Sequence, residues 1–213
     1  MLKIIGALAI FILASNAFSY ETFSTYCIDC SQGQNIGSCT PEIKTTVDAI
    51  IDEVNAPYSA NQSQCFMTNI VVRNITELDL RRRQISDVSP LSGLKKLEKL
   101  TLLGNEIEEL DPLSGLQNLK ELNLEINRIA DIRPLTGLRK IEILSLGFND
   151  YIADSKPLKN LLLLRELYVQ WNQISDLNPI SSLINLEVLF VHENQIQDFS
   201  VLSKLPKLKH TCT

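Results

Sequence analysis

WNQISDLNPISSLINLEVLFVHENQIQDF, residues 171–199, contains nearly the same phrase twice. The segment Trp171–Asp176 returns, slightly changed, as Glu193–Asp198, after a shift of 22 residues. Self-similarity at a fixed interval of this size is typical of chains that stack many copies of one short structural unit. The stretch therefore predicts a repeat architecture, and it raises the question of why the only tryptophan precedes a repeated asparagine.

The same interval extends over residues 75–207 and divides them into six copies. The fourth copy carries one extra residue near Tyr151, and residues 208–213 begin a seventh copy. With Ile75 as place 1 of the first copy, apolar residues recur at places 1, 4, 6, 11, 14, 17 and 20. Asparagine recurs at place 9, and proline occupies place 16 in five of the six copies.

This pattern assigns a conformation to each part of a copy. Alternation over places 3 to 7 predicts a short strand, with places 4 and 6 pointing inward and places 3, 5 and 7 outward. The segment that returns to the next strand is too short for a full α-helix, and its proline lacks a backbone donor, so 3-10 turns are expected there. One copy cannot bury its apolar edge alone, so neighbouring copies must complete the core.

The motif L-x-x-L-x-L-x-x-N-x-I, followed by P-L-x-x-L, resembles the leucine-rich repeat. Its 22-residue length is similar to the repeats of bacterial internalins and of a protein-phosphatase regulatory subunit, and the resemblance covers residues 75–213. It implies an α/β solenoid, a horseshoe with a parallel concave β-sheet, an irregular 3-10 convex side and a small helical N-terminal cap. In internalins the concave face binds a host protein, which implies a surface here but no particular ligand.

Two polar columns follow from the alignment. The place-9 asparagines should lie buried where the chain leaves each strand and satisfy backbone groups there; they are Asn105, Asn127, Asn149, Asn172 and Asn194. Arg83 breaks this column in the first copy, so its turn is expected to be solvated or built differently. Acids recur at place 13, where they either cap the following turn or form a calcium-binding ladder; capping is the preferred interpretation.

The first 19 residues have the features of a secretory signal peptide. Lys3 supplies a positive charge, residues 4–14 are small and apolar, and small residues follow at a suitable cleavage position. The alternative is a membrane anchor, but the apolar run is shorter than the ~20 residues that a spanning helix needs. We expect an exported protein, secreted or periplasmic, without membrane insertion after cleavage.

Residues 20–74 differ in composition from the repeats and are predicted to form the cap. Thr40, Pro41 and Glu42 are typical of a helix start, and apolar residues then share one helical face until residues 55–57; they are Ile43, Val47, Ile50, Ile51 and Val54. The region holds four cysteines, which in an exported protein imply two disulfides of unspecified pairing: Cys27, Cys30, Cys39 and Cys65. A zinc site and a redox pair are the alternatives.

Composition and motifs argue against most other functions. The net charge is −5, with a sequence pI near 5.1 and no evident basic patch, so nucleic acid and anionic membranes are not expected partners. No phosphate-binding loop or metalloprotease motif occurs, and a dyad of His192 with Cys212 lacks a third, orienting group. We expect no enzymatic activity, cofactor or metal.

Aromatic residues gather on the outward places of the later copies. The predicted ligand-binding residues of the concave face are Ile126, Phe148, Tyr168, Gln170, Trp171, Phe190 and His192. Aromatic side chains commonly anchor interfaces, so a protein ligand is expected. The alternative is a structural or self-assembling envelope protein, for which the last strand is relevant: Thr211 should point inward, and the outward Cys212, too far from the cap to pair with it, could link a homodimer.

Overall fold

The computed structural model describes residues 45–46, 48–50 and 74–213 of the 213-residue chain. The signal segment and the four cap cysteines, and with them the predictions made for these residues, lie outside the described residues. Residues 45–46 and 48–50 are helical, and Ala49 and Ile50 are buried in the same core as the repeats. The Thr46 hydroxyl donates to the carbonyl oxygen of Asp87 at 2.6 Å, which fastens this segment to the first copy.

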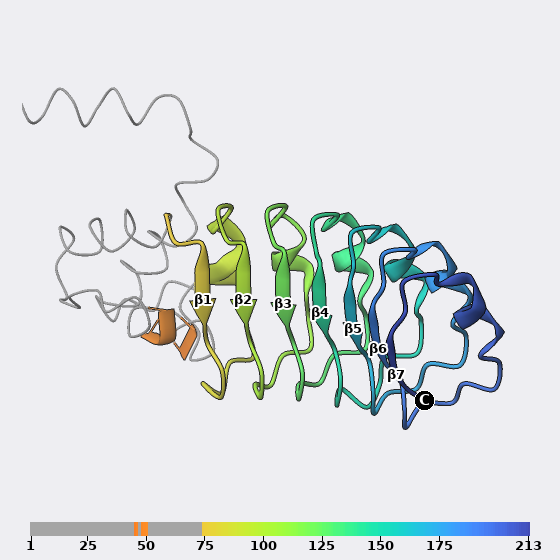
Figure 1. Ribbon diagram of the computed structural model, residues 1–213. Helices are drawn as coiled ribbons and strands as arrows, with labels where there is room; N and C mark the ends of the chain where they lie inside the picture. The colour runs from red at the N-terminus through yellow and green to blue at the C-terminus, as the bar shows by residue number, and fades with distance from the viewer. Residues whose placement is uncertain (1–44, 47, 51–73) are drawn as a thin grey trace, which may run out of the picture.

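The described repeats form one parallel sheet in which the strands follow each other in chain order (Figure 1). Each strand takes three residues from the outward–inward–outward places 3 to 5. The strands are β1 (Glu77–Asp79), β2 (Lys99–Thr101), β3 (Glu121–Asn123), β4 (Ile143–Ser145), β5 (Glu166–Tyr168), β6 (Val188–Phe190) and β7 (His210–Cys212). Equivalent places pair across every junction, as Leu100 does with Leu122, so the sequence period is also the register of the sheet.

Short 3-10 helices form the opposite side of the solenoid, as the proline pattern predicts. They are η1 (Ser89–Gly93), η2 (Asp111–Leu113), η3 (Arg133–Gly137), η4 (Lys156–Asn160), η5 (Asn178–Ser182) and η6 (Ser200–Lys204). In η1 to η5 the proline lies in the first turn, where its missing N–H is not needed. The fold is thus a leucine-lined solenoid with a concave sheet and a convex side of 3-10 turns.

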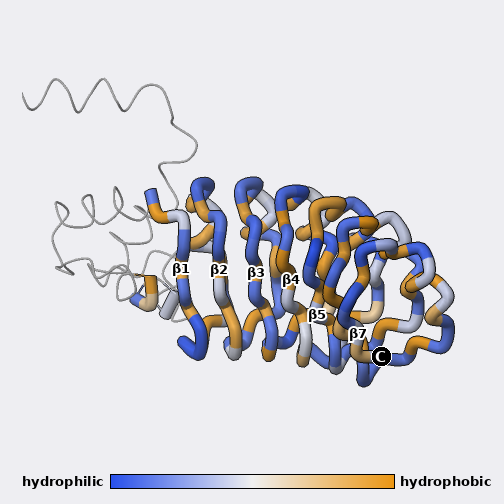
Figure 2. The backbone as a smooth tube through the Cα atoms, in the orientation of Figure 1, coloured by the Kyte–Doolittle hydropathy of each residue, from blue (hydrophilic) through white to orange (hydrophobic). Residues whose placement is uncertain are grey.

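The core is a continuous stack of aliphatic side chains between the sheet and the 3-10 helices. Figure 2 shows that hydrophobic positions recur along the backbone in successive copies. The inward strand residues, such as Leu100, Leu144 and Leu167, have no exposed surface. Each is covered by equivalent residues in the neighbouring copies, so stability arises from interfaces between adjacent copies. Thr211 of β7 has the predicted inward register opposite Leu189 but is exposed, because no further strand covers it.

The place-9 asparagines form a hydrogen-bonded column. Asn149 is fully buried; its Nδ2 donates to the carbonyl oxygens of Leu124 and Leu146 at 3.1 and 2.9 Å, and its Oδ1 accepts from the Ile129 N–H at 3.0 Å. Each amide thus joins its own copy to the preceding one. The equivalent carbonyl and N–H contacts are made by Asn105, Asn127, Asn172 and Asn194.

The residue before each asparagine has a left-handed backbone. At place 8 the φ angles of Ile126, Phe148 and Trp171 are 55°, 56° and 56°, and Gly104 has 71°. This conformation is rare for residues with a side chain and costs ~1–2 kcal/mol. It lets the chain leave the strand while the asparagine turns back onto the strand carbonyls, so the ladder bonds offset the strain.

Five of the six acids at place 13 cap the turns, Glu109 being the exception. The carboxylates of Asp87, Asp131, Asp154, Asp176 and Asp198 each accept the backbone N–H two residues later at 2.7–2.9 Å. The hydrogen bonds from Arg133 hold the pKa of Asp131 below its usual value. Within the described residues no group of three or more His, Cys, Asp or Glu side chains could hold a metal ion. The turn-capping interpretation accounts for the contacts of these acids.

Asn149→Ala should lower the free energy of unfolding by roughly 3 kcal/mol, because several buried backbone groups lose their partner at once. Asn194 makes the same contacts but is partly exposed. Asn194→Ala should lower it by only about 1 kcal/mol, because water can replace the amide. Urea denaturation of both variants measures the difference, and equal losses would contradict a buried, ladder-dependent turn.

Candidate binding surface

A stacked aromatic pair lies where β4 and β5 end. The rings of Phe148 and Trp171 are 5.9 Å apart between centroids and inclined by only 14°. Both occupy place 8, and Ile126 occupies the same place one copy earlier. The exposed fractions of Ile126, Phe148 and Trp171 are 50%, 41% and 45%. We call these three residues, two aromatic and one aliphatic, the aromatic rim. It is an apolar surface to which each of three consecutive copies contributes the side chain of its left-handed residue.

A second aromatic row lies on the outward face of the strands. The rings of Tyr168 and Phe190 are 5.2 Å apart, because the two residues are register partners on β5 and β6. Phe190 also contacts the imidazole of His192 edge-on, with 6.3 Å between centroids. These three side chains are partly buried. The aromatic rim and this row are therefore adjacent parts of one face of the solenoid.

The burial of Gln170 was not predicted from the sequence. The residue was expected to be an exposed contact residue, yet it is only 8% exposed. Gly147, at the same place in the preceding copy, leaves room for it, since a Cβ atom on Gly147 would lie 2.5 Å from the Gln170 Nε2. The amide crosses the fourth copy and donates to Glu125 Oε1 at 3.2 Å. Gln170 is therefore a buried residue that joins the fifth copy to the third.

Two buried side-chain atoms at place 7 have no hydrogen-bond partner among the described residues, namely Gln170 Oε1 and His192 Nδ1. The backbone N–H of His192 donates to the Cys212 carbonyl at 3.1 Å, but its imidazole makes no such bond to the Cys212 thiol. The structure thus does not assemble the dyad considered from the sequence. The chemistry of this face is apolar and aromatic contact with a few polar acceptors.

The ionisation of Tyr168 on this face depends on its burial and on the carboxylate of Glu166. The Tyr168 hydroxyl donates to Glu166 Oε2 at 2.8 Å. Burial, and then this bond to a negative group, raise the pKa of Tyr168 to about 12. The phenol is therefore neutral and fixed in orientation at physiological pH.

The sequence analysis missed a second feature, at the opposite end of the strands. A pocket of about 300 Å³ lies where the chain enters β4 to β6 and is lined by Glu142, Leu163, Arg165, Asn185, Glu187 and Lys207. These residues come from places 2 and 22, which lie outside the strand and outside the recurring apolar places. The alternation of acid and base at place 2, from Glu98 to Lys209, was the available signal.

Comparison with known proteins agrees with this geometry. Residues 73–115, 117–160 and 163–204, more than half of the chain, match the family model described as Leucine Rich repeats (2 copies). The chain belongs to the leucine-rich-repeat family. A comparison with the sequences of curated proteins found no match.

Solved structures of leucine-rich-repeat proteins have the same fold. An internalin of Listeria monocytogenes, InlF, is 29% identical with a TM-score of 0.66; the match covers 78% of this chain and 54% of that one. A second Listeria internalin, C2, is 28% identical with a TM-score of 0.60, covering 90% and 92%. A leucine-rich-repeat protein of Leptospira interrogans is 29% identical with a TM-score of 0.61, covering 68% and 38%.

The chain thus spans about half the length of InlF and most of the length of internalin C2. The predicted internalin-like leucine-rich-repeat fold is confirmed. Leucine-rich-repeat folds of this kind are protein–protein interaction modules. No helix in the described part of the chain is long and apolar enough to cross a membrane.

Glu166→Gln should lower the pKa of Tyr168 without restoring its ordinary value, because burial is the larger cause and remains. The folded-state pKa lies above the unfolded value of about 10. The contribution of Tyr168 to stability is therefore complete below that pH and is lost as pH rises toward the folded pKa. Ultraviolet titration of the phenolate, with Tyr168→Phe for subtraction, measures the change. An unaltered midpoint in Glu166→Gln would contradict the role given to the carboxylate.

Proposed function

We propose that this protein is an exported, non-enzymatic binding module that recognises another protein through the concave face of its repeats. The contact residues are the aromatic rim together with Tyr168, Phe190 and His192. Gln170, which was predicted from the sequence to be a contact residue, is left out because it is buried. The observation that carries the proposal is the exposed, stacked pair of Phe148 and Trp171.

The aromatic pair has the properties of an interface anchor. Large aromatic side chains that are preorganised and exposed give much contact area for little loss of conformational entropy on binding. The left-handed backbone at place 8 and the mutual stacking restrict both rings before a partner arrives. A rigid scaffold supports them, because the strand residues beneath are fully buried.

Export is the second part of the proposal. It is supported by the features of residues 1–19 and by the similarity to internalins. In an oxidising compartment the four cysteines of residues 20–74 are proposed to form two intrachain disulfides. These would secure the segment that covers the first copy of the solenoid.

Trp171→Ala should weaken binding of the protein ligand by at least ~2 kcal/mol if the ring is a hot spot. Affinity capture with the mature protein, followed by identification of the bound protein, supplies the ligand for this measurement. Tyr151→Ala is the matched control, because Tyr151 is an aromatic residue that is 59% exposed and lies outside the proposed contacts. Equal affinity for wild type and Trp171→Ala, with an unchanged fold, would exclude the aromatic rim as the binding surface.

The alternative is a self-assembling envelope protein, in which the aromatic rim and the edge of β7 contact further copies. The exposed free thiol of Cys212 on β7 favours it as a second candidate.

A binder of other proteins should be monomeric with and without reductant, with the four cap cysteines disulfide-bonded. A dimer that disappears with reductant and in Cys212→Ser would favour the alternative. Mass measurement combined with peptide mapping of the exported protein tests both statements, and free cap thiols or stoichiometric zinc would refute the disulfides.

A further inference from the structure

The edge of the sheet where the chain enters the strands carries two columns of polar side chains. At place 22 lysines donate to asparagines one copy earlier: Lys140 to Asn118 at 2.8 Å and Lys207 to Asn185 at 2.7 Å. At place 2 the side chains form ion pairs with the same place in neighbouring copies. Lys120 pairs with Glu98 at 2.6 Å, and Glu187 pairs with both Arg165 and Lys209 at 3.1 and 2.7 Å.

Both columns are interrupted in the fourth copy. Leu163 occupies place 22 where the neighbouring copies have lysine or asparagine. Glu142, at place 2, has no side-chain hydrogen bond or ion pair within the described chain, since the flanking Lys120 and Arg165 bond to other carboxylates. Along an edge whose other polar side chains are paired, Glu142 is thus a carboxylate without a partner among the described residues, and Leu163 is an apolar residue in a polar column.

Apolar surface extends outward from this interruption. Leu162, Leu163 and Ile184 are 52%, 49% and 55% exposed. In the first three copies the place of Leu162 and Ile184 is polar. Isolated exposed leucines need no explanation, but three in adjacent copies beside a pocket of about 300 Å³ form a shaped apolar surface.

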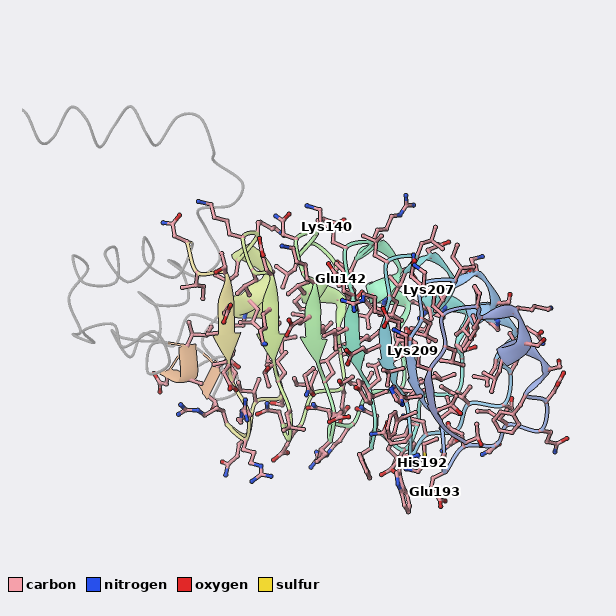
Figure 3. All side chains as sticks on the ribbon, viewed as in Figure 1. Lys140, Glu142, His192, Glu193, Lys207 and Lys209 are labelled. Carbon is pink, nitrogen blue, oxygen red and sulfur yellow. The ribbon has the colours of Figure 1, made fainter. Side chains whose placement is uncertain are left out.

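The pocket lining carries two bases, Arg165 and Lys207, and two acids, Glu142 and Glu187. Lys140 and Lys209, at the same places of the repeat, add two further bases beside it. Lys140 and Lys207 bond to neutral amides, so no carboxylate offsets their charge, while Arg165 and Lys209 share the single carboxylate of Glu187. Arg165 uses only its Nε in that pair, which leaves most of the guanidinium available as a donor. Figure 3 shows Lys140, Glu142, Lys207 and Lys209 on this part of the molecule, away from His192 and Glu193 beside the aromatic rim.

We propose that this edge pocket is a second binding site, for a segment of a partner protein in which an acidic residue adjoins an apolar one. The ligand carboxylate is held by Arg165 and Lys207, which offer a planar donor and a point charge. Its apolar neighbour packs on Leu163, between Leu162 and Ile184. Glu142 repels the carboxylate from its own side of the pocket and so fixes the direction of the segment.

The experiment uses a random peptide library displayed on phage, selected on protein that carries Trp171→Ala to weaken capture by the aromatic rim. Peptides are first depleted on the same protein with Leu163→Asp and Lys207→Glu added, so that the survivors depend on the edge pocket. Dissociation constants of the selected peptides are then measured by fluorescence anisotropy. Urea denaturation checks that every variant is folded.

The survivors should carry Asp or Glu next to a large apolar residue. Because electrostatic complementarity at an interface discriminates between charge signs, Lys207→Glu should weaken their binding at least ~10-fold and Glu142→Gln should strengthen it ~2-fold or more. Basic survivors, the opposite signs, or no survivors would overturn the proposal. Binding to vesicles with anionic lipid that is lost in the same double variant would also overturn it, by making a membrane the occupant.

Discussion

The amide of the repeated asparagine is the interaction on which the rest of the structure depends. In five of the six full copies one asparagine side chain accepts an N–H of the preceding copy and donates to a carbonyl of its own and of the preceding copy, as Asn149 does at full burial. No other residue type offers both an acceptor and two donors on so short a side chain. The ladder therefore fixes how far adjacent copies are shifted and holds the strands of the sheet in register.

The same ladder accounts for the position of the tryptophan. Turning the asparagine back onto the strand requires a left-handed residue immediately before it. A side chain at that residue is directed out of the core, so its identity can differ between copies without changing the packing of the core. Ile126, Phe148 and Trp171 make this position apolar in three consecutive copies, and a structural requirement becomes a surface suited to binding.

Much of this architecture could be predicted from the sequence, because a period repeated six times averages out the uncertainty of any one copy. The 3-10 turns, the asparagine column and five of the six turn-capping acids lie at the predicted places. The strands begin where predicted but take only places 3 to 5 of the predicted places 3 to 7. The burial of Gln170 could not be predicted, because it depends on a glycine 23 residues earlier and an acid 45 residues earlier. The edge pocket was not predicted because the net charge of the whole chain does not show which places of the repeat hold the acids and bases. Those charges come together at places 2 and 22 only when the copies stack.

The two proposed surfaces lie at opposite ends of the same short strands, so a partner could engage one without covering the other (Figure 3). Binding through the aromatic rim requires that the side chain at place 8 faces solvent in the free protein. Trp171, the only tryptophan, reports this directly through its fluorescence. Long-wavelength emission that is readily quenched by acrylamide in the free monomer is the predicted result. Blue-shifted emission that resists quenching would place Trp171 in the core and contradict the account.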